Sequence, residues 1–412
     1  MRAKIILYRE MVKRRDMKRQ TSQQRSRETR GKALCPRLGY FEERREEMVA
    51  TVRELVQVES PSDNKAACDR IGQLLAEKFA KLGGKVSFHR NSEFGDHLQA
   101  EFVREGAGKP VLLLGHMDTV YPVGTLATMP CRVADGKLYG PGSFDMKSGI
   151  ALILHAIEGL VSQRGQIPKK VQVLLVSDEE VGSTSSRRIT ENLARQCGAV
   201  LVLEPAAGAH GAVKTARKGV GEYSLRVSGV AAHAGLDPHK GHSAIVELAR
   251  QIERISKLGS LERGRSLNVG LVRGGTRTNV IAAEAVAEID VRIARASDGE
   301  VIDRKLRGLK PLDRRCSLEI SGGINRLPME RTAGVAALYR KARELATGLG
   351  WKLDEAAVGG GSDGNFTAGM GIPTLDGLGG VGEGAHAVHE SIVVSELPRR
   401  AALLAGLIES LT

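Results

Sequence analysis

Short apolar runs alternate with amphipathic segments along most of this chain. Residues 111–114, 171–176 and 199–203 are almost wholly apolar, which predicts buried strands of a parallel sheet covered on both faces. Apolar positions at helical spacing predict helices over 41–59, 65–82 and 148–160. Strands that alternate with helices in this way are typical of an α/β fold.

The pattern changes near residue 213. Strands near 222–227, 267–272, 286–293 and 317–320, with helices over 242–258 and 300–306, predict a compact α+β sandwich. The α/β pattern then resumes, with helices near 335–345 and 396–411. We therefore expect an α/β domain with a mixed, mostly parallel sheet and helices on both faces. Residues 40–212 and 325–412 would form this domain, and 213–324 would be inserted in it.

Charge is concentrated at the N-terminus. Residues 1–39 hold thirteen Lys and Arg against three acidic residues, which accounts for ten of the net charge of +13. The rest of the chain is nearly neutral, so the charge predicts no acidic partner for the folded part. Residues 1–39 could contact nucleic acid or an anionic membrane, but we expect a basic, disordered extension and no nucleic-acid partner.

The sequence also limits where the protein works. No apolar run of transmembrane length occurs, and the short apolar stretch at residues 5–7 does not fit a secretory signal. The five cysteines are odd in number, scattered and without a CxxC pair, which favours a reducing compartment and no thiolate metal site. We expect a cytoplasmic protein without membrane contacts.

Acidic and imidazole side chains follow each predicted parallel strand. His116 and Asp118 follow the first strand, Glu179 and Glu180 the second, and Glu204 the third. Asp145 lies in a glycine-rich loop between them. Alone, His116 fits a buried core histidine as well as a ligand, and a single acid fits a helix cap. Ligands bind beyond the carboxyl ends of strands in such sheets, so the set together predicts a site.

Carboxylates and imidazoles without cysteine suit zinc, manganese or cobalt. Five candidate ligands exceed the need of one ion, whereas two ions that share a bridging carboxylate would use all five. Two such ions can activate a shared water and stabilise an oxyanion. A neighbouring carboxylate that binds no metal could take the proton of that water, so Glu179 and Glu180 could divide these tasks.

Eight motifs in order make a family resemblance specific. GHMDTV, GPGSFDMKSG, SDEEVGS, LEP, SGVAAHAG, TNVIAAEAVAEIDVR, GGGSDGNF and GAH occur between about residue 40 and the C-terminus. Together they resemble the di-zinc exopeptidases, which include glutamate carboxypeptidase, aminoacylase, acetylornithine deacetylase, succinyl-diaminopimelate desuccinylase and peptidase T. HMDTVYP and GGGSD are most similar to the glutamate carboxypeptidase branch.

The resemblance implies a role for each motif residue. Two divalent ions, expected to be Zn²⁺ with Co²⁺ or Mn²⁺ as alternatives, would be held by His116, Asp145, Glu180, Glu204 and His386. Asp145 would bridge them, and the family often has a cis peptide bond after this residue. Glu179 would be the general base, and Asp118 would orient the imidazole of His116. The family's inserted domain forms a homodimer, so we expect one through 213–324.

Substrate contacts follow from the same resemblance. His233 would reach the partner subunit's active site and polarise the scissile carbonyl. Arg326 would bind the substrate's free carboxylate, for which a guanidinium fork is suited. The remaining substrate-binding positions would be Asn279, Arg292, Gly360, Gly361 and Ser362.

These assignments lead us to expect an exopeptidase that cleaves an amide next to a free α-carboxylate by attack of a metal-bridged water. It would release a C-terminal amino acid such as glutamate. One alternative is an N-acyl amino acid deacylase with the same site, and another is a catalytically inactive binding protein on this fold. His389 departs from the family pattern and leaves open which imidazole, His386 or His389, binds metal.

Overall fold

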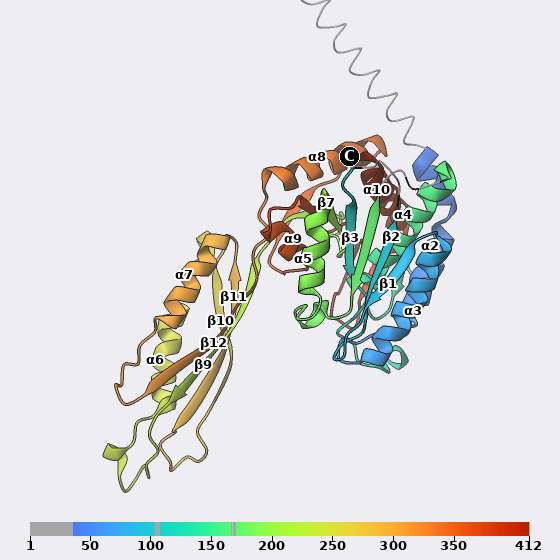
Figure 1. Cartoon of the computed structure of the whole chain (residues 1–412). Helices are drawn as coiled ribbons and strands as arrows, with labels where there is room; N and C mark the ends of the chain where they lie inside the picture. The colour runs from blue at the N-terminus through green and yellow to red at the C-terminus, as the bar shows by residue number, and fades with distance from the viewer. Residues whose placement is uncertain (1–35, 104–107, 166, 168–169, 412) are drawn as a thin grey trace, which may run out of the picture.

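The structure is a computed structural model that describes residues 36–103, 108–165, 167 and 170–411. Most of the basic extension predicted over 1–39 therefore lies outside the described residues. Figure 1 shows a larger lobe of sheet and helices joined to a smaller, elongated lobe. Within the described ranges, no helix is long and apolar enough to cross a membrane.

A six-stranded sheet forms the centre of the larger lobe. Its strand order is β1-β2-β6-β3-β7-β14. Strand β2 is antiparallel to both of its neighbours, β1 and β6, whereas β6, β3, β7 and β14 are parallel to one another. The prediction of a mixed, mostly parallel sheet is confirmed. The bounds are Lys85–His89 (β1), His97–Phe102 (β2), Val111–His116 (β3), Val171–Val176 (β6), Ala199–Val202 (β7) and Thr374–Leu375 (β14).

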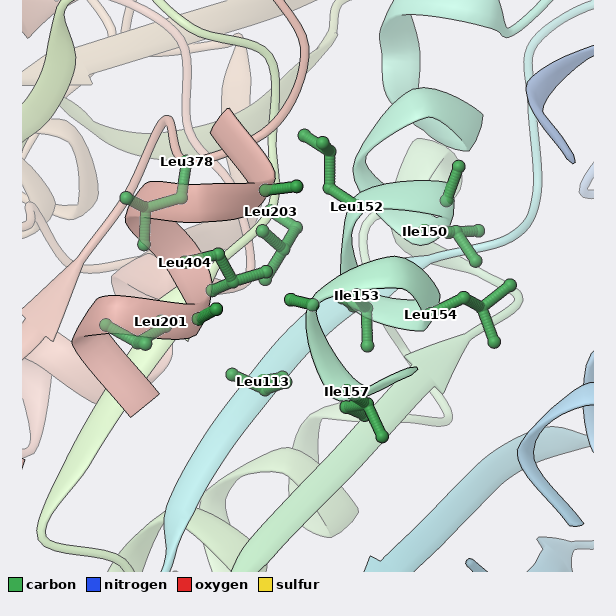
Figure 2. Packing of buried hydrophobic residues seen from close by; sticks show 14 of the residues in the cluster. Leu113, Ile150, Leu152, Ile153, Leu154, Ile157, Leu201, Leu203, Leu378 and Leu404 are labelled. Carbon is green, nitrogen blue, oxygen red and sulfur yellow. The ribbon is translucent and has the colours of Figure 1, made fainter. Parts of the chain in front are cut away.

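Both faces of β3 are covered, as its apolar run predicts. Leu113 packs in one core with helices α4 (Ser148–Arg164) and α10 (Leu397–Ser410), as Figure 2 shows. Leu112 and Leu114 point to the opposite face, where they pack beside α5 (Arg187–Gln196). Each such leucine contributes about 1.5–3 kcal/mol through burial. The position of the residues that follow β3 is therefore fixed by packing on two sides.

Helices cover the larger lobe on both faces of the sheet (Figure 1). Helix α4 is apolar around most of its circumference and is buried along nearly its whole length, as such a helix must be. Other helices of this lobe are α2 (Arg45–Val56), α3 (Lys65–Lys81), α8 (Ala333–Gly348) and α9 (Gly364–Gly369).

Small sheets flank the central one. Strand β8 (Val213–Arg217) pairs in parallel with β13 (Glu355–Val358). A four-stranded sheet of order β15-β16-β5-β4 joins Gly382–Glu383 (β15), Ser391–Val393 (β16), Lys137–Tyr139 (β5) and Arg132–Ala134 (β4). This second sheet brings the chain near residue 386 beside the loop that carries Asp145.

The smaller lobe is a separate antiparallel-sheet domain. Its strand order is β10-β11-β9-β12, and α6 (Ala244–Ser256) and α7 (Ala296–Arg307) pack against it in a core of their own. The strands are Gly219–Ser228 (β9), Ser266–Gly274 (β10), Glu284–Ile293 (β11) and Ser317–Arg326 (β12). Pairing within this sheet thus begins at residue 219 and ends at Arg326, next to the larger lobe.

Candidate active site

The carboxyl ends of β3, β6 and β7 bring four predicted residues together, and the loop before α4 adds Asp145. His116, Glu179 and Glu204 offer ligand atoms that all lie within 4.8 Å of one another, and so do His116, Asp145 and Glu180. Side chains at the ends of neighbouring parallel strands meet at one edge of the sheet. The strand-end pattern of the sequence therefore corresponds to one compact cluster.

Asp145 lies at the centre of this cluster and faces two ways. Its Oδ1 is 3.1 Å from Nε2 of His116, and that Nε2 is 3.4 Å from Oε1 of Glu204. Its Oδ2 is 3.7 Å from Nε2 of His386, and that Nε2 is 3.1 Å from Oε2 of Glu180. Each carboxylate oxygen thus faces its own imidazole and its own glutamate.

The electrostatics of the cluster reflect crowded negative charge. Burial raises the pKa of Glu179 well above its usual value, and burial also raises that of Glu180. Burial lowers the pKa of His116, but hydrogen bonds with Asp118 and other carboxylates outweigh it and hold the pKa well above the usual range. The hydrogen bond with Glu180 raises the pKa of His386 to about 9. Positive charge is strongly favoured here.

The donor set fits divalent cations. It combines imidazole nitrogens with carboxylate oxygens and contains no thiolate, which suits zinc, cobalt or manganese. Oε1 of Glu180 is buried and has no hydrogen-bond partner among the described residues. A buried carboxylate oxygen of this kind is costly unless a cation satisfies it. The residues present therefore fit the predicted pair of ions.

A glutamate that the sequence analysis missed holds the Asp145 loop. Glu390 is fully buried, and its carboxylate accepts hydrogen bonds from the backbone N–H groups of Gly142, Phe144 and Asp145 at 2.8–3.0 Å. The Asp145–Met146 peptide bond is cis, as the family resemblance implied. The sequence signal for Glu390 is its place four residues after His386, at the end of AHAVHE.

Asp118 contacts two of the three strand ends that carry predicted ligands, those of β3 and β6. Its main-chain oxygen lies 3.0 Å from Nδ1 of His116, and its Oδ1 lies 3.5 Å from the same nitrogen. Its carboxylate also accepts from the backbone N–H of Glu179 and of Glu180, and from the Ser62 hydroxyl. Asp118 thus contacts both His116 and the loop after β6, and its orienting role stays a prediction.

Arg326 reaches Glu179 across the site. Its Nη2 donates to Oε1 of Glu179 at 3.1 Å, to Oγ of Ser183 at 2.7 Å and to Oδ1 of Asp363 at 3.0 Å. The side chain is largely buried, and its Nε has no hydrogen-bond partner among the described residues. The guanidinium group thus lies beside the predicted base and keeps a free donor.

The predicted glycine turn is tied to the cluster through a second arginine. Arg217, buried and absent from the predicted site, donates to the main-chain oxygens of Gly360 and Gly361 and to Oε2 of Glu204. Its Nε and Nη2 also bind Asp376, whose Oδ2 accepts from the hydroxyl of Ser362 at 2.6 Å. A Cβ on Gly361 would lie 3.3 Å from Cδ of Arg326, so the turn packs closely there.

Three predicted substrate residues lie on the smaller lobe. His233 and Asn279 belong to adjoining loops, because the N–H of Ala234 donates to the main-chain oxygen of Asn279. These loops are at the end of the sheet far from the larger lobe. Arg292, which pairs with Asp290, lies at the near end, where it and Arg326 flank Val220 on β9. No hydrogen bond or ion pair among the described residues joins these three to the carboxylate cluster.

The two histidines near the C-terminus differ in position. His386 faces Asp145 and Glu180 and has a backbone φ of +64°, which non-glycine residues rarely adopt. Both histidines are exposed, but among the described residues no hydrogen bond or ion pair joins His389 to the cluster. We expect His386→Ala to weaken metal binding at least about tenfold and His389→Ala to leave it within about twofold. Calorimetric zinc titration of both variants measures this, and equal losses would contradict the assignment.

Known proteins are similar to this chain in sequence over most of its length. The sequence pattern of Peptidase family M20/M25/M40 matches residues 112–410. Carboxypeptidase G2 of Pseudomonas sp. (strain RS-16) is 30% identical over 370 residues, which cover 88% of this chain and 89% of that protein. Succinyl-diaminopimelate desuccinylase of Xanthomonas campestris pv. campestris (strain 8004) is 31% identical over 324 residues, 74% of this chain and 85% of that one.

A solved structure shares the fold. The aminopeptidase PepT from Bacillus cereus ATCC 10987 superposes with a TM-score of 0.73 at 24% identity, covering 89% of this chain and 98% of that chain. The family predicted from the eight motifs is thereby confirmed. The chain belongs to peptidase family M20/M25/M40.

Proposed function

We propose that this protein is a metal-dependent exopeptidase that hydrolyses an amide bond next to a free α-carboxylate and releases a C-terminal amino acid such as glutamate. The observation that supports this best is the arrangement of Asp145, whose two oxygens face separate imidazole–glutamate pairs. Arg326, a buried arginine with a free donor, contacts Glu179 next to this arrangement. The similarity to carboxypeptidase G2 supports the same reaction.

His116, Asp145 and Glu204 would hold one ion, and Asp145, Glu180 and His386 the other. When bound, such ions lower the pKa of water and stabilise negative charge on the reacting carbonyl oxygen. Glu390 contributes by fixing the backbone of Asp145, and Asp118 by fixing the backbone of Glu180 and contacting the imidazole of His116. Arg217 holds one oxygen of Glu204 at 3.2 Å and leaves the other directed at His116.

Glu179 is the base in this proposal. It lies within 4.8 Å of His116 and Glu204, and it is not needed as a ligand, so its carboxylate can accept and return a proton. It would take a proton from the attacking water and deliver it to the nitrogen of the leaving amino acid. Arg326, 3.1 Å away, would bind the carboxylate of that amino acid.

His233 would act on a second copy of the chain. Its Nδ1 accepts from the backbone N–H groups of Gly235 and Leu236 at 3.1 Å, so in the neutral imidazole Nε2 carries the proton and can donate it to an oxyanion. Strand β10 is a sheet edge and exposes Leu271 and Val272, which supports the proposed homodimer through the smaller lobe.

An N-acyl amino acid deacylase is the second candidate. The similarity to a succinyl-diaminopimelate desuccinylase favours it, and the same cluster would perform that reaction. The third possibility, a binding protein without activity, is disfavoured by the complete donor set, because buried carboxylates are costly when no cation uses them.

Hydrolysis assays test the proposed reaction. Dipeptides that end in glutamate and N-acyl amino acids, each with its C-terminal carboxamide as a counterpart, would be incubated with the zinc-loaded protein. We expect cleavage of the free acids only. Cleavage of acids and carboxamides at equal rates would contradict the proposed carboxylate recognition.

The role of Arg326 gives a sharper expectation. Arg326→Gln removes a charged donor worth about 1.5–3 kcal/mol, so kcat/KM for the free acid should fall about 10–100-fold, towards the value for the carboxamide. Arg331→Gln is the matched control, since Arg331 is exposed and pairs with Glu355 outside the cluster. Preference for the acid that persists in Arg326→Gln would show that another residue binds the carboxylate.

A further inference from the structure

The site is chemically different on its two sides. Both arginines of the cluster lie on one side: Arg326 contacts Glu179, and Arg217 contacts Glu204. On the other side, next to Glu180, the surface forms a hollow of about 270 Å³. Pro61, Asp63, Val120, Pro122 and Val181 line this hollow together with Glu180, and none of its lining residues is Lys or Arg.

Two valines of the hollow are exposed. The exposed fraction is 41% for Val120 and 48% for Val181. Val120 is two residues after Asp118, and Val181 directly follows Glu180. Exposed apolar side chains beside polar catalytic groups are typical of ligand sites, which combine apolar walls with a few polar groups. Neither valine has a role in the proposed reaction.

We propose that this hollow binds the acyl part of the substrate and selects an uncharged, apolar acyl group over a dicarboxylic one such as succinyl. The inference rests on the proposed function. A substrate whose α-carboxylate lies at Arg326 has its scissile amide at the cluster, so its acyl part extends to the Glu180 side. There it meets valine and proline side chains and the exposed carboxylate of Asp63.

Size and charge support this choice. At ~30 Å³ for each water-sized group, the hollow has room for about nine such groups, far more than an acetyl group needs. An anionic acyl group would find no Lys or Arg in the lining to pair with and would be repelled by Asp63. An apolar acyl group would instead remove Val120 and Val181 from water.

A substrate series tests the proposal. N-octanoyl-, N-acetyl- and N-succinyl-L-glutamate share the amino acid and differ only in the acyl part. We expect kcat/KM of the zinc-loaded wild-type protein to be at least about tenfold higher for the octanoyl than for the acetyl compound, and lowest for the succinyl compound. Equal values for octanoyl and acetyl, or a preference for succinyl, would overturn the proposal.

Paired variants test whether the hollow causes the acyl preference. Val181→Asp should lower kcat/KM for N-octanoyl-L-glutamate about tenfold and change that for N-acetyl-L-glutamate less than twofold. Val133→Asp is the matched control, because Val133 has the same exposed fraction of 48% but does not line the hollow. Equal losses in both variants would overturn the proposal. Val120→Asp replaces Val181→Asp if thermal unfolding shows the latter to be misfolded.

Asp63→Lys tests the proposal through an expected gain of activity. Reversing this exposed charge should raise kcat/KM for N-succinyl-L-glutamate about threefold relative to N-octanoyl-L-glutamate. An unchanged ratio would contradict the placement of the acyl group beside Asp63. The proposed function and the acyl site fail in different ways. If neither N-acyl-L-glutamates nor dipeptides that end in glutamate are hydrolysed, the proposed function fails, whereas hydrolysis of N-acyl-L-glutamates without acyl preference overturns the acyl site alone.

Discussion

We expect the Glu179→Ala variant to bind its metal ions normally and to turn over substrate about 10²–10⁴-fold more slowly than the wild-type protein. Glu179 lies beside His116 and Glu204 but is not needed to complete either half of the cluster around Asp145. Its loss therefore removes the proposed proton carrier and leaves both ligand sets intact. Steady-state kcat and the metal content per chain measure the two parts of this expectation.

Glu191→Ala is a suitable control for that variant. Glu191 lies on α5 and pairs with Arg187 and Arg195 away from the cluster. It should keep kcat within about twofold, as exposed ion pairs contribute only about 0–1 kcal/mol. A Glu179→Ala protein with near wild-type kcat would show that another group moves the proton.

The Asp145→Ala variant should instead lose metal. Asp145 is the one side chain that faces both halves of the cluster, so its removal takes a ligand from each. At 100 times the dissociation constant, zinc should stabilise the wild-type fold by about 2.7 kcal/mol, and the variant should gain little or none of this. Thermal unfolding with and without zinc provides a readout that is independent of activity.

Asp237→Ala controls for the loss of an aspartate elsewhere. Asp237 is on the smaller lobe and pairs with Lys240. This variant should show the full zinc-dependent stabilisation. If Asp145→Ala were stabilised by zinc as strongly as Asp237→Ala, the bridging role of Asp145 would be wrong.

The sequence predicts the centre of the fold well because each apolar run has one structural solution. The run ending at His116 is β3, buried on both faces by alternate leucines, and the run ending at Val176 is β6 with the predicted bounds. Once these strands are parallel neighbours, the residues that follow them must meet. The carboxylate cluster is therefore the part of the site that periodicity and strand ends can find.

Residues that contact segments distant in the sequence could not be found from periodicity and strand ends. Glu390 satisfies three N–H groups that are about 245 residues earlier in the chain, and Arg217 joins Glu204 to a turn about 145 residues later. No local pattern distinguishes either from a surface charge. The choice between His386 and His389 likewise depends on the turn after Gly384, which sets the direction of each side chain.

The account depends most on the two ions that the cluster would hold. Metal would be removed from the protein with a chelator, and Zn²⁺, Co²⁺ or Mn²⁺ would be added back in steps while hydrolysis of an N-acyl-L-glutamate is followed. We predict that activity disappears on removal and returns in full as two ions bind per chain. Full activity in protein that holds no metal would contradict the account.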